Sequence, residues 1–300
     1  MWSGWLVGRV LLAAVAALLT VGVARSVVSA HDGRFVVRAK DGEILNKMRI
    51  ILCVCVALVF AAQAAPASAD PFVGPPICTA AGTALSGIHG NMTVHGNAYV
   101  ANGKQLAVWG NLTLAPGSCL DAFTLGTVHV QGSVFVEKGA ILALGCTPNA
   151  IGPQPPCGTT TTNDIVDGSV IADHALTMYL DGDHIHGDVV STGGGPGPTL
   201  DPYINFPIKD NIVGGNVVVQ GWQGAWFGAL RNTVHGSVIL THNVGVTTGD
   251  SGVPDSTEVA TNTITGDLIC HGNVPAAQIG DSGGSPNTVK GRELGQCVGL

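Results

Sequence analysis

The stretch NTVHGSVIL (residues 232–240) contains the unit that decides the fold. It joins an Asn-Thr start and a glycine, Gly236, to an alternating apolar segment, as a short β-strand requires. The unit recurs as IHGNMTV (88–94), VWGNLTL (108–114), VQGSVFV (130–136), VDGSVIA (166–172), IHGDVVS (185–191), VGGNVVV (213–219), VHGSVIL (234–240) and ITGDLIC (264–270), with a degenerate VKGR (289–292). His-Gly therefore recurs as part of a repeat, which makes it a weak sign of catalysis.

The spacing of the glycines at the centre of these units defines the architecture. Among the eight regular units, neighbouring glycines lie 19 to 22 residues apart wherever no insertion intervenes. The longer steps contain CTPNAIGPQPPC (146–157), GGGPGPTLDPYINFP (193–207) or TTGDSGVPDSTE (247–258). Insertions between regular units are what a solenoid tolerates, since each coil contacts only its neighbours.

Each coil of about 20 residues holds three short β-branched segments and no capped helical pattern. This predicts an all-β chain: a parallel β-helix of about nine coils with loop insertions and disulfide-bearing caps. No strict hexapeptide repeat is present, and parallel crossovers favour one hand, so we predict the right-handed form. The helix should span residues 88–270, between an N-terminal cap (70–87) and a C-terminal cap (271–300).

The first 69 residues contain two apolar runs. The second follows Lys47, Met48 and Arg49 and ends in Ala-Ser-Ala before Asp70, which is typical of a signal peptide over 48–69. Translation is then expected to start at Met48, and 1–47 would be an upstream extension. The alternative makes the first run (10–24) the signal or an anchor. Either interpretation predicts a secreted or cell-surface protein, and removal of a signal peptide would leave no membrane contact.

The exported part carries six Lys and Arg against seventeen Asp and Glu. No basic stripe is present to neutralise phosphates, so the composition argues against a nucleic-acid partner. Its six cysteines, an even number without a C-x-x-C pair, favour disulfides over metal ligation. Proximity in sequence predicts three bonds, although fifteen connectivities are open. The predicted pairs are Cys78–Cys119, Cys146–Cys157 and Cys270–Cys297.

An Asn or Asp stands four residues before the central glycine in six consecutive units. Such side chains satisfy nearby backbone groups at turns and, stacked at the strand spacing, bond along the solenoid axis. We interpret them as a structural ladder: Asp164, Asp183, Asn211, Asn232, Asn262 and Asn287.

The N-T-V-x-G coils, the export signal and the C-terminal GGSPNTVKGRELGQC (283–297) carry a resemblance. Over residues 88–297 the chain resembles secreted actinobacterial right-handed β-helix proteins, most of which have no assigned function. More distantly it is similar to the pectate-lyase-like superfold, which includes polysaccharide lyases, hydrolases and non-catalytic adhesins. The resemblance implies a fold and leaves the function open.

The segment DGDHIHGD (181–188) is the candidate for chemistry. In the repeat register Asp183 stacks on Asp164, and His186 stacks on Asp167. Asp164, Asp183 and His186 are the candidate acid–base residues, and Asp164, Asp181 and Asp183 the candidate ligands of a Ca²⁺ ion. The competing interpretation makes the two stacked acids ordinary members of the ladder, with no cofactor. The ladder interpretation is favoured, because no basic residue in a recognisable motif accompanies the acids.

A group of aromatic residues is the second candidate, because rings on loops beside a rigid scaffold commonly stack on sugars. The group lies in YINFP and GWQGAWFG and comprises Tyr203, Phe206, Trp222, Trp226 and Phe227. The alternative interpretation is an apolar cluster that packs loops onto the helix.

Three functions follow as hypotheses. The first is a secreted, non-catalytic, monomeric β-helix that binds a glycan or cell-wall polymer. The second is a polysaccharide lyase or hydrolase at the acidic patch, and the third is a purely structural envelope protein. At the repeat position of His235 six of the other coils carry Trp, Gln, Asp, Gly, Thr or Lys, so that position is predicted to face solvent.

Overall fold

The computed structural model describes residues 77–78, 82–148, 159–196, 206–245, 256–280 and 284–300, and two strands near the N-terminus. The chain divides into two units, Met1–Asp70 and Pro71–Leu300. In the first unit, β1 (Val27–His31) and β2 (Arg34–Arg38) pair antiparallel. The predicted signal peptide (48–69) lies outside the described residues. Within the described ranges, no helix has the length and hydropathy that crossing a membrane would take.

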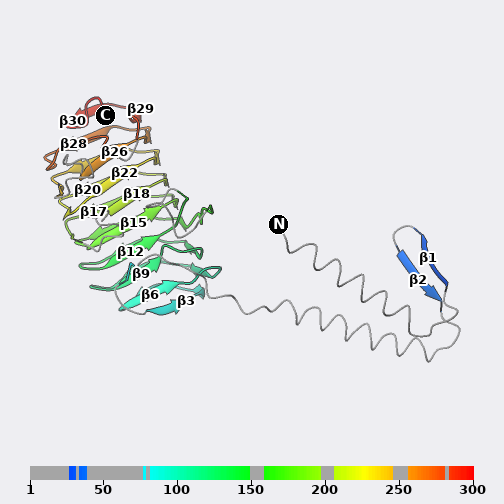
Figure 1. Cartoon of the computed structure of the whole chain (residues 1–300). Helices are drawn as coiled ribbons and strands as arrows, with labels where there is room; N and C mark the ends of the chain where they lie inside the picture. Colours follow the sequence, from blue (N-terminus) through cyan, green and yellow to red (C-terminus); the bar gives the residue numbers. More distant parts are fainter. Residues whose placement is uncertain are drawn as a thin grey trace. The chain divides into compact units, whose positions relative to one another are not determined.

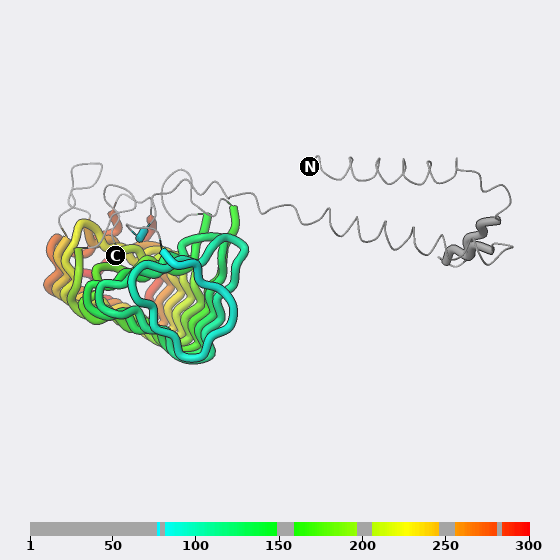
Figure 2. The backbone as a smooth tube through the Cα atoms, turned by 90° about the horizontal axis from the view of Figure 1, so that it is seen from below, coloured from blue at the N-terminus to red at the C-terminus, as the bar shows by residue number. Residues whose placement is uncertain are grey.

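The second unit is a parallel β-helix, as the repeat predicts (Figure 1). Its coils lie one behind another when viewed along the axis (Figure 2). Three parallel sheets of eight, nine and nine strands run the length of the solenoid, so the described residues form nine coils.

The strands of each sheet follow in coil order. Sheet 1 comprises β3 (Thr83–Leu85), β6 (Asn97–Val100), β9 (Cys119–Ala122), β12 (Ile141–Leu144), β15 (Thr177–Asp181), β18 (Phe206–Lys209), β22 (Phe227–Leu230) and β26 (Thr257–Ala260). Sheet 2 comprises β4 (Gly87–His89), β7 (Gln105–Val108), β10 (Thr127–Val130), β13 (Ile165–Val166), β16 (His184–Ile185), β19 (Ile212–Val213), β23 (Thr233–Val234), β27 (Thr263–Ile264) and β29 (Thr288–Val289). Sheet 3 comprises β5 (Met92–Val94), β8 (Leu112–Leu114), β11 (Val134–Val136), β14 (Val170–Asp173), β17 (Val189–Thr192), β20 (Val217–Gln220), β24 (Val238–Thr241), β28 (Leu268–His271) and β30 (Glu293–Gly295). A separate two-stranded sheet pairs β21 (Gln223–Gly224) with β25 (Val244–Gly245).

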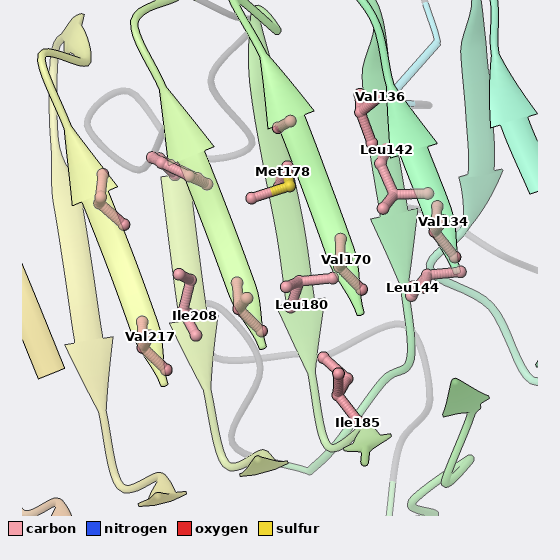
Figure 3. Packing of buried hydrophobic residues seen from close by; sticks show 14 of the residues in the cluster. Val134, Val136, Leu142, Leu144, Val170, Met178, Leu180, Ile185, Ile208 and Val217 are labelled. Carbon is pink, nitrogen blue, oxygen red and sulfur yellow. The ribbon is translucent and has the colours of Figure 1, made fainter. Parts of the chain in front are cut away.

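The core fills the space between the three sheets with aliphatic side chains (Figure 3). Leu142 and Leu180 point inward from sheet 1, Val134 and Val170 from sheet 3, and Ile185 from sheet 2 (Figure 3). All five are buried. Equivalent side chains therefore stack coil on coil, and burial of these small aliphatic ladders supplies the main driving force for folding.

A column of glycines explains why the repeat keeps its central residue. From Gly132 onward, each of these glycines donates its N–H to the carbonyl of the preceding one; Gly168 bonds Gly132 O at 2.9 Å. A Cβ atom on Gly168 would lie 2.6 Å from that oxygen. Such a contact is too short for any side chain, so the close approach of neighbouring turns requires glycine.

The first coil departs from the repeat register. Ile88 pairs with Ala107, and Val108 pairs with His89, whereas the sequence alignment places Ile88 beside Val108. The shift turns Ile88 outward, where it is 67% exposed. The strand at the end of a solenoid has a neighbour on one side only, so its register is less firmly specified than in inner coils.

Two of the three predicted disulfides are confirmed, Cys78–Cys119 and Cys270–Cys297. Cys146 is also disulfide-bonded, and its expected partner Cys157 lies outside the described residues. Structural disulfides indicate that the protein folds in an oxidising environment. Cys78 bonds to the third coil and packs outside sheet 1.

From β9 to β26, sheet 1 differs from the other two sheets in being buried on both faces. In β12, β15, β18, β22 and β26 every side chain is buried, whereas strands of sheet 3 alternate between buried and more exposed residues. Its outer face carries two further apolar clusters, one around Phe123 and Tyr179 and one around Trp226 and Leu230. From the third coil onward, the exposed surfaces of the sheets therefore belong to sheets 2 and 3.

A left-handed backbone residue precedes the ladder position in successive coils. Asn163, Asp210, Arg231 and Thr261 have φ angles of 53°, 57°, 57° and 59°. Thr261 is the unfavourable member, because a β-branched side chain crowds the backbone in this conformation.

We therefore expect Thr261→Asn to raise the free energy of unfolding by up to about 1 kcal/mol, since Asn tolerates positive φ. Chemical denaturation of the full chain measures the change. Asn163→Asp, which exchanges two residues that both tolerate this conformation, is the matched control and should alter stability little. A loss of stability in Thr261→Asn would show that the Thr261 hydroxyl, which accepts the Ser285 N–H at 2.8 Å, outweighs the relief of crowding.

Candidate functional site

The predicted Asn and Asp residues lie in one column at the turn between sheets 1 and 2. Asn211 donates its Nδ2 to Leu180 O and to Asn232 Oδ1, both at 3.0 Å. Asn232 repeats this arrangement with Ile208 O at 2.8 Å and Asn262 Oδ1 at 3.0 Å. Each amide thus satisfies one backbone carbonyl and the next amide, in a buried setting where an unpaired group would be costly.

The column ends on the last residue of the chain. Asn287 donates its backbone N–H and its Nδ2 to Leu300 O, at 2.6 and 2.7 Å. At the other end the column begins with acids. Ile165 pairs with His184, which places Asp164 next to Asp183.

Asp164 and Asp183 are fully buried, but their hydrogen bonding differs. Asp164 accepts the N–H groups of Val128 and Gly145, at 2.9 and 3.0 Å. Asp183 donates its own N–H to Asn211 Oδ1 at 2.8 Å. Neither carboxyl oxygen of Asp183 has a partner with hydrogen-bond geometry. Asp183 thus occupies an Asn position without the Nδ2 donor that the column uses elsewhere.

The protonation of these acids follows from their burial. Burial raises the pKa of Asp183 well above its usual range, and the nearby Asp164 and Asp181 raise it further. Burial also raises the pKa of Asp164, against the lowering effect of its two backbone hydrogen bonds. A protonated Asp183 offers an O–H donor at the place where Asn offers Nδ2.

Asp181 lies between the buried acid Asp183 and Lys209, a charged residue on the outer face of sheet 1. It accepts the Thr147 hydroxyl at 3.0 Å, and burial followed by the charge of Asp210 raises its pKa to about 7. Lys209 lies beside it in the next strand, with Nζ 5.0 Å from the centroid of the Trp226 ring. Burial lowers the pKa of this lysine.

The next charged pair lies at the turn where Asp210 and Arg231 meet. Arg231 Nε and Nη2 bind the two oxygens of Asp210, each at 2.8 Å. This bidentate pair is partly buried. Its planar fork geometry holds both side chains in place over the turn.

The three candidate carboxyls are poorly placed for chemistry on a polymer. Asp164, Asp181 and Asp183 are at most 1% exposed, so a sugar chain could reach none of them without opening the turn. Across the described part of the chain, no three His, Cys, Asp or Glu side chains are grouped to hold a metal ion. The geometry favours a structural role for these acids.

His186 lies on the exposed surface of sheet 2, away from the buried acids. Its Nδ1 is 3.2 Å from Asp167 Oδ1, as the repeat register indicates. His129 Nε2 approaches the other oxygen of Asp167 at 3.0 Å. His186 therefore belongs to a solvent-exposed His-Asp-His group and does not meet Asp164 or Asp183.

The predicted aromatic group lies largely in the interior. Phe206 and Phe227 begin strands of sheet 1 and contact each other inside the solenoid, with ring centroids 5.4 Å apart. Trp222 packs beside Phe206 and donates its Nε1 to Leu176 O at 3.3 Å. Trp226 is buried over Lys209, and Tyr203 lies outside the described residues. None of the four described rings offers a free face to a sugar.

The outer face of sheet 3 carries an apolar row that the sequence analysis passed over. The strand registers align one outward side chain per coil, and in seven successive coils it is apolar. We call this the apolar row: Phe135, Ile171, Val190, Val218, Ile239, Ile269 and Leu294. All seven are at least partly exposed.

Polar side chains border the apolar row on both sides. One border is a second hydrogen-bonded ladder after the central glycines, in which Asn216 accepts the Ser237 N–H at 2.8 Å. The other consists of the outward residues at the ends of the same strands: Asp173, Thr192, Gln220, Thr241 and His271. The row is thus one side chain wide.

A shallow depression of about 420 Å³ lies at the N-terminal end of the apolar row. Phe135 and Ile171 lie on its apolar side, together with Pro116. Glu137, Lys138 and Asp173 supply charged groups. An apolar ring beside a few polar groups is the usual composition of a small-ligand site.

A pattern in the sequence could have revealed the row. In VFV, VVV, VIL and LIC, the central residue of each triplet is apolar, although a strand with one wet face should carry a polar residue there. No family model, no curated protein and no solved structure matches the chain.

Proposed function

We propose that this protein is a secreted, non-catalytic β-helix that binds a glycan of the cell envelope or the surroundings. The observation that carries the proposal is the depression at Phe135 on the exposed face of sheet 3. An aromatic ring packs on the C–H face of a sugar, and Glu137, Lys138 and Asp173 offer hydrogen bonds to hydroxyls. The burial of Asp164, Asp181 and Asp183 supports binding over hydrolysis.

The acidic composition supports a neutral ligand over an anionic polymer, because no basic surface would offset the repulsion. The disulfides and the predicted signal peptide support export.

The test is Phe135→Thr in the full chain, assayed on a glycan panel and then by titration calorimetry. Threonine already occupies the same column in the preceding coil, as Thr113, so the substitution preserves strand geometry. Loss of the ring should weaken binding about tenfold, since an aromatic contact contributes about 0.5–1.5 kcal/mol beyond its burial.

Trp109→Thr is the control, because Trp109 is a 62% exposed aromatic residue outside sheet 3 and its loss should leave the affinity unchanged. Equal weakening in both variants, or absence of glycan binding by the wild type, would contradict the proposal. The second of these outcomes would favour the purely structural envelope protein.

A further inference from the structure

The apolar row continues past the depression for the rest of the solenoid. Phe135 and Ile171 belong to both features, and five more side chains follow toward the C-terminus in consecutive coils. At the usual spacing of neighbouring strands, the seven positions span about 29 Å. A ligand seated in the depression can therefore extend along the row.

We propose that the apolar row binds an extended, neutral, β-linked polysaccharide whose chain runs parallel to the solenoid axis, with about one sugar ring over each coil. This inference rests on the proposed glycan function and names its ligand class. The apolar faces of the rings lie on the row, and their edge hydroxyls meet the polar residues on either side. An equatorially linked polysaccharide presents flat rings at a rise close to the coil spacing, whereas a coiled, axially linked polysaccharide does not.

The width of the row separates this ligand from other occupants. A stable protein interface buries roughly 800 Å² on each partner around a broad apolar core. The apolar row is one side chain wide between two polar borders, which suits a single polymer chain better than a second copy of the protein. A lipid surface would likewise need a wider apolar face.

The border residues match a ligand rich in hydroxyl groups. Thr192, Gln220 and Thr241 follow one another in paired strands on one side. With Asp173 and His271 they offer donors or acceptors in five successive coils, as a polymer with a repeating set of hydroxyls requires. A regular ligand on a regular surface gains affinity with each added unit.

The experiment measures the affinity of the full chain for β-1,4-linked glucose and β-1,4-linked N-acetylglucosamine oligomers, from disaccharide to octasaccharide. We expect at least a tenfold decrease of Kd between the disaccharide and the hexasaccharide for one of the two series. The double variant Ile239→Thr/Ile269→Thr should keep the gain up to the tetrasaccharide, whose rings lie over Phe135 to Val218, and lose the further gain from tetrasaccharide to hexasaccharide. Phe135→Thr should weaken binding at every length.

The outcomes separate the two proposals. Affinity that depends on Phe135 but neither on oligomer length nor on the double substitution would overturn the axial polymer and leave glycan binding intact. Absence of binding at all lengths would overturn both. Sedimentation tests whether a second copy of the protein occupies the row. A dimeric wild type and a monomeric double variant would assign the row to this contact and overturn the inference. Thermal melts of each variant confirm that it is folded.

Discussion

Asn232→Ala is expected to lower the free energy of unfolding by about 3–5 kcal/mol, because several buried groups lose their partners at once. Asn232 Oδ1 accepts from both the N–H and the Nδ2 of Asn211, each at 3.0 Å. Its own Nδ2 donates to Ile208 O and Asn262 Oδ1. Alanine removes all four hydrogen bonds, and water cannot replace them in a dry turn.

Urea denaturation of the full chain measures this loss. His235→Ala is the control, since His235 is exposed in the same coil, and we expect it to change stability by less than about 0.5 kcal/mol. An Asn232→Ala variant as stable as His235→Ala would show that the column contributes nothing beyond its backbone pairing.

Asp183→Asn is expected to stabilise the protein, by about 1–3 kcal/mol near pH 8, because it supplies the donor that the column lacks at this position. The pKa of Asp183 is raised in the folded state by burial and by Asp164 and Asp181. The unfolded chain releases this proton near pH 4, and the folded state retains it to higher pH. The contribution of Asp183 to the stability of the wild type therefore falls as pH rises above about 4.

The variant should show a shallower fall, and its advantage over the wild type should grow with pH. A residual slope is expected, since Asp181 keeps a pKa of about 7 through burial and the charge of Asp210. Asp188→Asn is the control, because Asp188 occupies a partly exposed ladder position on sheet 3. Denaturation curves between pH 4 and pH 8 decide the matter. A stabilisation that is constant with pH would show that Asp183 is ionised in the folded protein.

The repeat unit was sufficient to predict most of the fold, because period, glycine and alternation act together in each coil. Gly168 and its equivalents marked a turn, repeated in successive coils, whose backbone contacts admit no side chain. The Asn and Asp residues marked the buried turn column, since they stand at a constant distance from the glycine. The register predicted for the first coil was wrong. Ile88 pairs one residue away from the predicted position, because its strand has only one neighbour to fix the register.

The candidate site was harder to predict, because burial depends on which segments cover which sheet. Phe206 and Phe227 looked like loop residues and prove to be strand residues that point inward. Lys209 and Asp181 lie on the outer face of sheet 1, where Trp226 and Thr147 contact them. The repeat pattern does not predict this coverage. The apolar central residues of the strand triplets could be read from the sequence. That they form an exposed row could be known only from the structure, in which the outer face of sheet 3 contacts solvent.

The corner between sheets 2 and 3 holds three residues in every coil from the second to the last, with the central glycine in the middle. The three insertions all lie beside strands of sheet 1, before or after them. Length can therefore change over evolution at the ends of sheet 1 without altering the pitch of sheet 3. The segments next to the strands of sheet 1 can therefore vary in length, while the three-residue corner keeps the spacing of sheet 3 constant from coil to coil.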